Sequence, residues 1–264
     1  MTVSFNAGSL GLPTGLKDKP RVDFRVNDFV RVIESKGYRV AWQRASPCPC
    51  VPINAQTDQV NPNCTLCSGQ GWILFKPSYA VTDARTIGEL TPLQAQLAAD
   101  AAVVRAVMSG LTATKQPYLD IGPRLEGQLM VTMRAENKLA YYDRIVNLDA
   151  VAVYAQIATL ESGDTVPLRY PAVHVNLLRS ESAVYTEGTD FDVVAGAVIF
   201  RTGVATTGLR VACHYLTHPS WRIVEHPHNV RLTQVKTKQT SLATPAGNPS
   251  DLPVQAIAKL EFLL

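Results

Sequence analysis

Four of the five cysteines in this chain of 264 residues lie within residues 48–67. Cys48 and Cys50 form a CPC pair, Cys64 and Cys67 form a CTLC pair, and 13 residues separate the two pairs. Four thiolates at this spacing suit a tetrahedral zinc ion, whereas a disulfide framework is expected of small secreted chains. The cysteines therefore predict one structural zinc site in a protein that folds under reducing conditions.

The second pair continues as CTLCSGQGW and predicts the more specific local geometry, a zinc knuckle. In a knuckle, backbone N–H groups point at the first sulfur, here that of Cys64. Gly69 and Gly71 allow the chain to turn back past the ion without a Cβ clash, and Trp72 is expected to lie against the knuckle and shield it. Four sulfur ligands leave no open position for water or substrate, so the ion is expected to be structural.

The CPC pair is less regular, because two cysteines separated by one residue on an extended chain do not converge readily on one ion. Pro49 must lie in a turn if Cys48 and Cys50 are to reach the same metal. Without that turn, three cysteines and a carboxylate such as Asp58 form the alternative ligand set. A redox CxxC and uncoordinated thiols are further alternatives, but a redox motif needs a helix after its second cysteine, and the SGQGW segment cannot start one.

Composition limits what the rest of the chain can do. Hydrophobic residues make up 46% of the sequence and charged residues 18%, which is enough for one large domain or two small ones with cores. The net charge of +3 lacks the global positive excess of a dedicated duplex-DNA binder. The sequence shows neither a signal peptide nor an apolar run of about 20 residues, so we expect a soluble protein that folds in a cytoplasm without a membrane partner.

Short runs of alternating apolar and polar residues fill residues 128–215, a pattern typical of strands. Turn-forming residues interrupt the runs near residues 161–164, 187–189 and 207–208. The predicted strands are residues 129–134, 143–148, 151–160, 172–179, 191–194, 197–201, 209–216 and 222–224. Their spacing predicts a mainly β protein with minor α-structure, built on an antiparallel β-barrel or sandwich.

The N-terminal part of the chain is expected to hold an arm, a helix and a strand. Residues 1–23 show no apolar period and are predicted to form an extended arm. Asn27 or Asp28 can cap a helix that Gly37 ends in a left-handed conformation. The apolar face of this helix is predicted to consist of Phe29, Val32 and Ile33, and the strand after it alternates Tyr38, Val40 and Trp42 with polar residues.

A second helix is predicted from Thr91, its cap, with Pro92 in the first turn. The β-branched residues after Ala102 make helix and strand equally supported up to residue 109. The predicted domains are an arm (1–23), a module of helix, strand and zinc knuckle (24–80), a β-barrel or sandwich with a helical segment near 91–109 (81–232), and a C-terminal arm (233–264).

The C-terminal arm combines a polar, Pro/Gly-punctuated linker with an apolar end. Such an end needs a docking site, either on this barrel or on a neighbouring subunit. We expect it to dock as a strand or short helix on an adjacent subunit. The residues predicted at that subunit interface are Ile257, Leu260, Phe262, Leu263 and Leu264.

Other clusters of polar residues support no catalytic site. The four neighbouring histidines are expected to be ordinary turn and surface residues: His214, His218, His226 and His228. Asp190 and Asp192 are expected to flank a solvated turn, and Cys213 to be a buried small apolar residue. A P-loop, a dinucleotide glycine fingerprint, GxSxG and HExxH are all absent from the sequence. The chain is therefore not expected to be an enzyme or to bind a small-molecule substrate.

Several phrases together resemble neck and tail structural proteins of contractile-tailed bacteriophages. They span about residues 28–232 and are YRVAWQRASPCPC, CTLCSGQGWILF, YYDRIVNLDA, YTEGTDFDVVAGAVIF and HPSWRIVEHPHNVR. The resemblance is strongest in the cysteine segment and in the Tyr-x-x-Gly-x-Asp-Phe hairpin at residues 185–191. The segment 93–109 and the chain after Lys236 do not match.

This resemblance implies a virion protein at the head-to-tail junction, a collar, connector or gatekeeper subunit that joins capsid to tail and through which the genome passes. It implies assembly in the host cytoplasm into a homo-oligomeric ring of six or twelve copies beside portal, connector and tail proteins. The first 47 residues carry eight Lys and Arg against four Asp and Glu, a face that in a ring could make transient contact with genomic DNA. The alternatives are a tail or baseplate structural protein and a zinc-knuckle nucleic-acid-binding protein.

Overall fold

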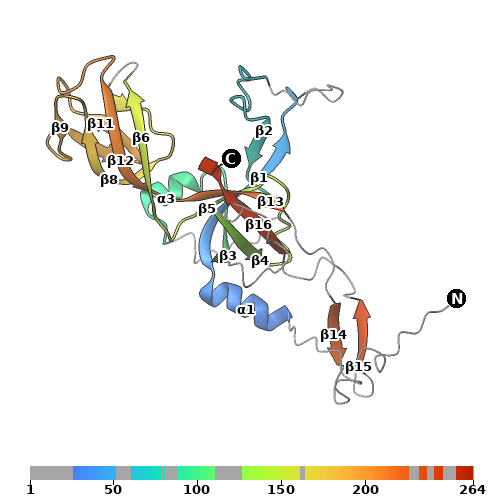
Figure 1. Ribbon diagram of the computed structural model, residues 1–264. Helices are drawn as coiled ribbons and strands as arrows, with labels where there is room; N and C mark the ends of the chain where they lie inside the picture. The colour runs from blue at the N-terminus through green and yellow to red at the C-terminus, as the bar shows by residue number, and fades with distance from the viewer. Residues whose placement is uncertain are drawn as a thin grey trace, which may run out of the picture.

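The computed structural model describes residues 26–51, 61–78, 80, 89–110, 127–160, 164–225, 232–236, 241–245 and 254–263. These residues form a β-barrel, a second β lobe, a projecting cysteine segment and a separate hairpin of β14 (Leu232–Lys236) and β15 (Ser241–Pro245) (Figure 1). Among them, no helix has the length and apolar character needed to cross a bilayer. The predicted arm of residues 1–23 lies outside the described residues, as do Asp58, His226, His228 and Leu264.

Six antiparallel strands form the barrel, which confirms the mainly β prediction. In order around the barrel they are β1 (Tyr38–Pro47), β3 (Ala102–Gly110), β4 (Gln128–Met133), β16 (Val254–Leu260), β13 (Ser220–Glu225) and β5 (Arg144–Asn147). The first half of β1 pairs with β3 on one side and with β5 on the other. This double pairing closes the barrel and removes its free edges.

Alternating side chains of each strand fill the barrel. Val40 and Trp42 of β1 are both fully buried inside it. The remaining buried core residues are Ala102, Val104, Ala106, Val131, Met133, Leu139, Ile145, Trp221, Ile223, Ala256 and Ala258. Large side chains on β1 and β13 and small ones on β3 and β16 together form this core.

The segment after Thr91 contains a short helix followed by a strand. Thr91 caps α3 (Pro92–Leu97) in a capping box with Gln94, as its sequence predicts. The helix ends at Leu97, so the helical segment expected near residues 91–109 covers only its beginning. Residues 102–110 are β3 because both faces are buried: Val104 points into the barrel, and Val103 packs beneath α3.

The N-terminal helix α1 (Val26–Lys36) differs from its prediction in three ways, the first being that Asn27 and Asp28, expected as its cap, lie inside it. Ile33 is fully buried, but Val32, expected on the same face, is 41% exposed. Gly37 is not left-handed; its N–H donates to the carbonyl of Ile33 at 2.8 Å. Glycine is needed there because a Cβ would lie 2.3 Å from that carbonyl oxygen.

The apolar C-terminal segment is a strand of the chain's own barrel. β16 lies between β4 and β13, with Ala256, Ile257 and Ala258 buried. The structure therefore places this segment within its own barrel rather than on an adjacent subunit, because β16 pairs with both β4 and β13 and its three central residues are buried on both faces of the sheet. Past Leu260, the single turn η6 (Glu261–Leu263) leaves Phe262 and Leu263 exposed.

The second lobe is a sandwich inserted into the barrel between β5 and β13. One sheet has the order β6 (Ala152–Thr159), β12 (Arg210–Thr217), β8 (Ala172–Arg179) and β9 (Val184–Tyr185). The other has the order β10 (Phe191–Val194), β11 (Ala197–Phe200) and β7 (Thr165–Val166). The two sheets share one core, which includes Leu178, Phe191, Phe200 and Tyr215. Barrel and sandwich, alternatives in the sequence, are both present.

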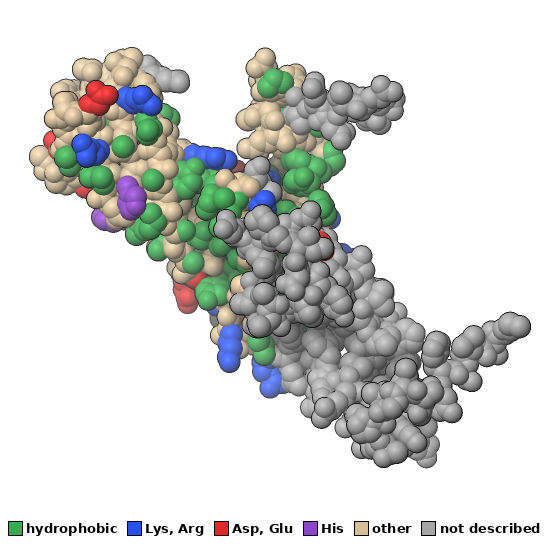
Figure 2. Space-filling model, in the orientation of Figure 1, with side chains coloured by type: hydrophobic (Ala, Val, Ile, Leu, Met, Phe, Trp, Pro, Cys, Tyr) green, Lys and Arg blue, Asp and Glu red, His purple; other side chains and the backbone are tan. Residues whose placement is uncertain are grey.

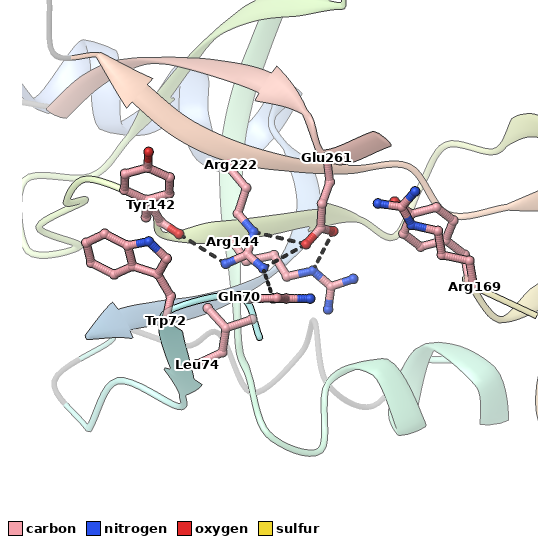
Figure 3. Close-up of a pocket in the computed structure, with 9 residues that line it drawn as sticks. Gln70, Trp72, Leu74, Tyr142, Arg144, Arg169, Arg222 and Glu261 are labelled. Atoms are coloured by element: carbon pink, nitrogen blue, oxygen red, sulfur yellow. Dashed lines mark hydrogen bonds and ion pairs between the residues drawn. The ribbon is translucent and has the colours of Figure 1, made fainter. Parts of the chain in front are cut away.

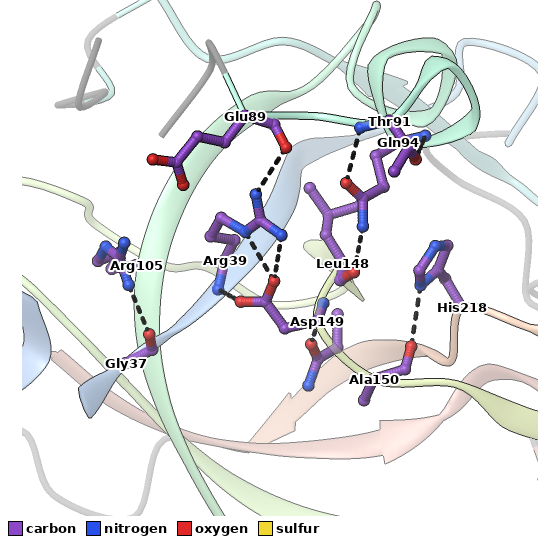
Figure 4. A network of polar contacts seen from close by, with 11 residues as sticks. Gly37, Arg39, Glu89, Thr91, Gln94, Arg105, Leu148, Asp149, Ala150 and His218 are labelled. Carbon is purple, nitrogen blue, oxygen red and sulfur yellow. Dashed lines mark hydrogen bonds and ion pairs between the residues drawn. The ribbon is translucent and has the colours of Figure 1, made fainter. Parts of the chain in front are cut away.

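A polar network fixes the point where the chain leaves the barrel for the sandwich (Figure 4). Asp149 accepts from the backbone N–H of Arg39 and from its Nε, each at 2.6 Å. Gln94 donates to the carbonyl of Leu148 at 2.7 Å, which ties α3 to the same connection. Nδ1 of His218, on the returning connection, lies 2.9 Å from the carbonyl of Ala150. The outgoing and returning chains are thus held together.

The position of β16 predicts that its centre stabilises the whole barrel. Replacing Ile257 by Ala should lower the free energy of unfolding by about 2–5 kcal/mol, because it opens a cavity at a buried site. Leu263→Ala, at a side chain that is 41% exposed, should cost about 1 kcal/mol or less. Urea unfolding followed by tryptophan fluorescence measures both; equal losses would contradict the placement of β16.

Candidate metal centre

The cysteine segment extends from a hairpin that continues the barrel. The second half of β1, Arg44–Pro47, pairs with β2 (Trp72–Phe75) instead of with barrel strands. Pro47 lies opposite Trp72, so Cys48 leaves one strand beside the point where the chain enters the other. The hairpin thereby brings the CPC and CTLC pairs together at its tip (Figure 1).

The four sulfurs form one compact cluster. All four Sγ atoms lie within 4.8 Å of one another. The Sγ atoms of Cys48 and Cys64 are 3.7 Å apart, and those of Cys50 and Cys67 are 3.5 Å apart. A tetrahedral ion with metal–sulfur bonds of about 2.3 Å places its sulfurs about 3.8 Å from one another. The distances are too long for disulfides and fit a metal site with four thiolate ligands.

Pro49 lies in a turn, as the shared site requires. The N–H of Val51 donates to the carbonyl of Cys48 at 3.0 Å and closes this turn. The bend turns the side chains of Cys48 and Cys50 toward the same cluster. Four ligands are therefore present without Asp58, the carboxylate considered as a substitute.

The knuckle after Cys64 has the predicted left-handed turns. Gly69 and Gly71 have φ values of 76° and 77°, and a Cβ on Gly69 would lie 2.9 Å from the carbonyl oxygen of Pro62. The N–H of Gly71 donates to Sγ of Cys67 at 3.3 Å. Backbone N–H groups of Cys67 and Leu66 lower the pKa of Cys64 to about 6, which favours the thiolate form that binds metals.

Trp72, expected to shield the knuckle, packs on the barrel. Its ring stacks on Tyr142 of the barrel, with centroids 4.4 Å apart and planes inclined by 17°. Tyr142 has a φ of 61°, a left-handed conformation that is unusual for a residue with a large side chain. The stack attaches the base of the cysteine hairpin to the barrel, while Cys48 and Cys67 are buried by the turns of the segment itself.

The residues that the sequence set aside lie apart from the cysteine cluster. Asp190 accepts from the N–H of Thr186 at 2.7 Å, whereas Asp192 accepts two bonds from Arg201 at 3.0 Å, which lowers the pKa of Asp192. The two carboxylates therefore serve different partners. Cys213 is 1% exposed in the sandwich core, as predicted, and burial raises the pKa of its thiol to about 11.

His214 and His218 also have separate partners. Nδ1 of His214 lies 3.3 Å from the side-chain amide of Asn176, on the face of the sandwich sheet. His218, expected at the surface, is instead buried in the connection between the lobes, where its Nδ1 lies at the carbonyl of Ala150. Neither histidine belongs to a group of metal ligands among the described residues.

Sequence reasoning missed a cavity beside the cysteine segment, with a volume of 430 Å³. Its lining residues include Arg144, Arg222 and Glu261, which come from β5, β13 and the turn after β16. No local motif links residues so far apart in the chain. Only the closure of the barrel brings them together.

The sequence matches no established protein family and no curated protein. The chemistry of the cysteine segment follows from its geometry: four sulfur ligands complete a tetrahedral shell and leave no coordination position for a substrate. The arrangement suits a structural metal rather than a catalytic one.

Thiol reactivity tests the metal centre. In the native protein the four clustered cysteines should resist a thiol reagent, because a bound metal holds them as ligands. A strong chelator should release one metal ion per chain and expose four thiols, while Cys213 stays protected in the sandwich core. Free reaction of the cluster in the folded protein, with no stoichiometric metal in elemental analysis, would contradict the site.

Replacing Cys64 by Ser should abolish stoichiometric metal binding and expose the amides of residues 48–71 to hydrogen exchange. The barrel should stay folded, because residues 38–43 of β1 are held by β3 and β5 and not by the metal. The matched control, Cys213→Ser, should keep the metal and weaken only the sandwich. Collapse of the whole barrel in Cys64→Ser would show that the metal acts globally.

Proposed function

We propose that this chain is a structural protein of a tailed-bacteriophage virion, a subunit of a homo-oligomeric ring at the head-to-tail junction. In this role it joins capsid to tail, contacts portal or connector and tail proteins, and lets the genome pass. The sequence phrases that resemble neck and tail proteins suggest the class. The observation that carries an assembly role is an apolar surface on the sandwich.

That surface is the outer face of the sheet that contains β6, β12 and β8, and we call it the apolar outer face. Its members are Val153, Ala155, Ile157, Leu177, Ala212 and Leu216. Val153 and Ile157 are 58% and 63% exposed, although they stand in the middle of a strand. Figure 2 shows hydrophobic side chains on this lobe beside an exposed histidine. His214 interrupts this face between Ala155 and Leu177, but an exposed apolar patch of this kind marks a contact with another protein.

The free edge of the same sheet also favours contact with another copy of this chain. β6 pairs only with β12 among the described strands, so its other edge is available for pairing. Residues 151–160 contain no charged residue and no proline, the usual protections of an edge strand. We infer that a neighbouring copy of this chain covers the edge and the apolar outer face. Repetition of one such contact around an axis produces a closed ring.

We propose zinc as the metal of the cysteine cluster. Four thiolates in a tetrahedral arrangement prefer zinc among the common divalent ions. Bound zinc would cross-link four positions of the chain. These bonds replace the hydrophobic core that a segment of turns cannot build. The ion holds the tip of the β1–β2 hairpin rigid, so that the hairpin can serve as a fixed projection in an assembly.

The mass of the native particle tests the ring. We expect six or twelve copies, measured by native mass spectrometry, with a central hole in electron micrographs. Ile157→Lys should reduce the particle to smaller species, because it places a charge in the apolar outer face. Val194→Lys is the control, at a side chain on β10 that is 55% exposed. A monomeric wild type, or an unchanged particle in Ile157→Lys, would contradict the proposal.

A further inference from the structure

The cavity of 430 Å³ lies where the cysteine hairpin, the barrel and the sandwich meet (Figure 3). Trp72 and Leu74 of β2 form one wall with Tyr142. Arg144 and Arg222 reach it from β5 and β13, and Glu261 from the turn after β16. Arg169 and Tyr170 contribute from the sandwich. The volume is within the range of small-molecule sites, about 300–1,000 Å³.

Both carboxylate oxygens of Glu261 accept hydrogen bonds from neighbouring side chains. Its Oε1 accepts from Nε of Arg222 at 2.9 Å and lies 2.8 Å from Nη2 of the same guanidinium. Its Oε2 accepts from Nε of Arg144 at 2.9 Å and from the hydroxyl of Ser220 at 2.6 Å. Burial opposes ionisation, but the two guanidinium groups hold the pKa of Glu261 below its ordinary value. The carboxylate therefore has no capacity to neutralise a third cation.

The cavity nevertheless contains a third arginine. Arg169 lies over the ring of Tyr170, 5.5 Å from its centroid, and hydrogen-bonds the side chain of Tyr154, but among the described residues it forms no ion pair with a carboxylate. Its lining carries three arginines against one glutamate, a net charge of 3 − 1 = +2. Arg222, which is 7% exposed, and Arg144, whose side chain is 23% exposed, share the single negative charge of Glu261, while Arg169 is exposed at the cavity. Unbalanced charge in a partly enclosed site is unfavourable and attracts an anion.

Tyr170 provides an independent indication of a missing partner. Its side chain is 7% exposed, and its hydroxyl is the only buried side-chain nitrogen or oxygen without a hydrogen-bond partner in the part of the chain that the structure describes. A buried hydroxyl normally finds an acceptor. Tyr170 lines the same cavity as the arginines, so a shift of its ring would bring this hydroxyl, which water does not reach in the structure, to an anion bound there.

We propose that this cavity binds a phosphate monoester. A phosphate monoester carries a charge of about −1.5 to −2 near neutral pH and has three strong acceptor oxygens, which match the net charge and the donors. A single carboxylate would leave one positive charge unbalanced. The guanidinium groups of Arg144 and Arg169 and the hydroxyl of Tyr170 are the donors, and guanidinium is well suited to phosphate. The remaining volume, walled by Trp72 and Tyr142, accommodates the organic part.

The cysteine segment takes part in this site. Gln70, between Cys67 and Gly71, accepts from Nη2 of Arg222 at 3.2 Å. The turn that follows the second cysteine pair thus holds a buried arginine of the barrel in position. The inference does not depend on assembly into a virion, since all the lining residues belong to one chain.

Titration of the metal-loaded full-length protein tests the site. The probes are inorganic phosphate, adenosine monophosphate and, as an uncharged control, adenosine, at an ionic strength of about 0.15 M. Calorimetry measures affinity, and the fluorescence of Trp72 in the wall reports occupancy. Both phosphate probes should bind saturably, and adenosine should not. Tighter binding of the nucleotide than of inorganic phosphate would show that the cavity also binds a planar ring. Equal affinities would show that it recognises the phosphate group alone.

Two variants separate a binding role from a structural one. Arg169→Gln should weaken phosphate binding about tenfold, because it removes a charge-assisted donor. Tyr170→Phe should weaken binding several-fold while leaving unfolding in the absence of phosphate unchanged or shifted to higher urea, because it removes an unpaired buried hydroxyl.

Arg201→Gln is the control, at an exposed arginine that pairs with Asp192 outside the cavity, and should leave phosphate affinity unchanged. Absence of saturable binding by either phosphate probe would overturn the proposal. Equal affinities of Arg169→Gln, Tyr170→Phe and the wild type would also overturn it, since binding would then occur elsewhere on the surface.

Discussion

Closure of the six-stranded barrel is the constraint on which the rest of the structure depends. β1 pairs with two barrel strands along its first half and with β2 along its second half. One continuous strand therefore belongs to the barrel core and to the stem of the cysteine hairpin. The sandwich is inserted between β5 and β13, which are neighbours in the barrel, so its two connections must leave and return side by side. Loss of barrel closure would displace both the cysteine hairpin and the sandwich.

The cysteine hairpin and the cavity illustrate two ways of stabilising structure outside a hydrophobic core. At the tip of the hairpin, four thiolates converge where the turns offer little apolar surface to bury. At its base, the stack of Trp72 on Tyr142 and the bond between Gln70 and Arg222 join it to the barrel. The same base forms a wall of the cavity. Metal binding at the tip can therefore influence the arginine cluster through a segment of only a few residues.

Local patterns predicted much of this architecture. The cysteine spacing, the need for a turn at Pro49 and the glycines at 69 and 71 were sufficient to predict the cluster, because its ligands are close in sequence. Most sandwich strands followed from alternation of apolar residues. The sequence did not reveal that residues 254–260 close the barrel, because an apolar end of a chain has the same pattern whether it docks on its own fold or on another. The arginine cavity was missed because its parts meet only through long-range strand pairing.

The four clustered cysteines at the tip of the barrel hairpin are expected to hold one metal ion in a tetrahedral centre. X-ray absorption spectroscopy at the edge of the bound metal tests it most directly, on the protein purified without added metal. We expect a zinc edge with four sulfur ligands at about 2.3 Å and no nitrogen or oxygen in the first coordination sphere. A first sphere that contains nitrogen or oxygen in place of one or more sulfurs, or a protein that holds no metal, would contradict it.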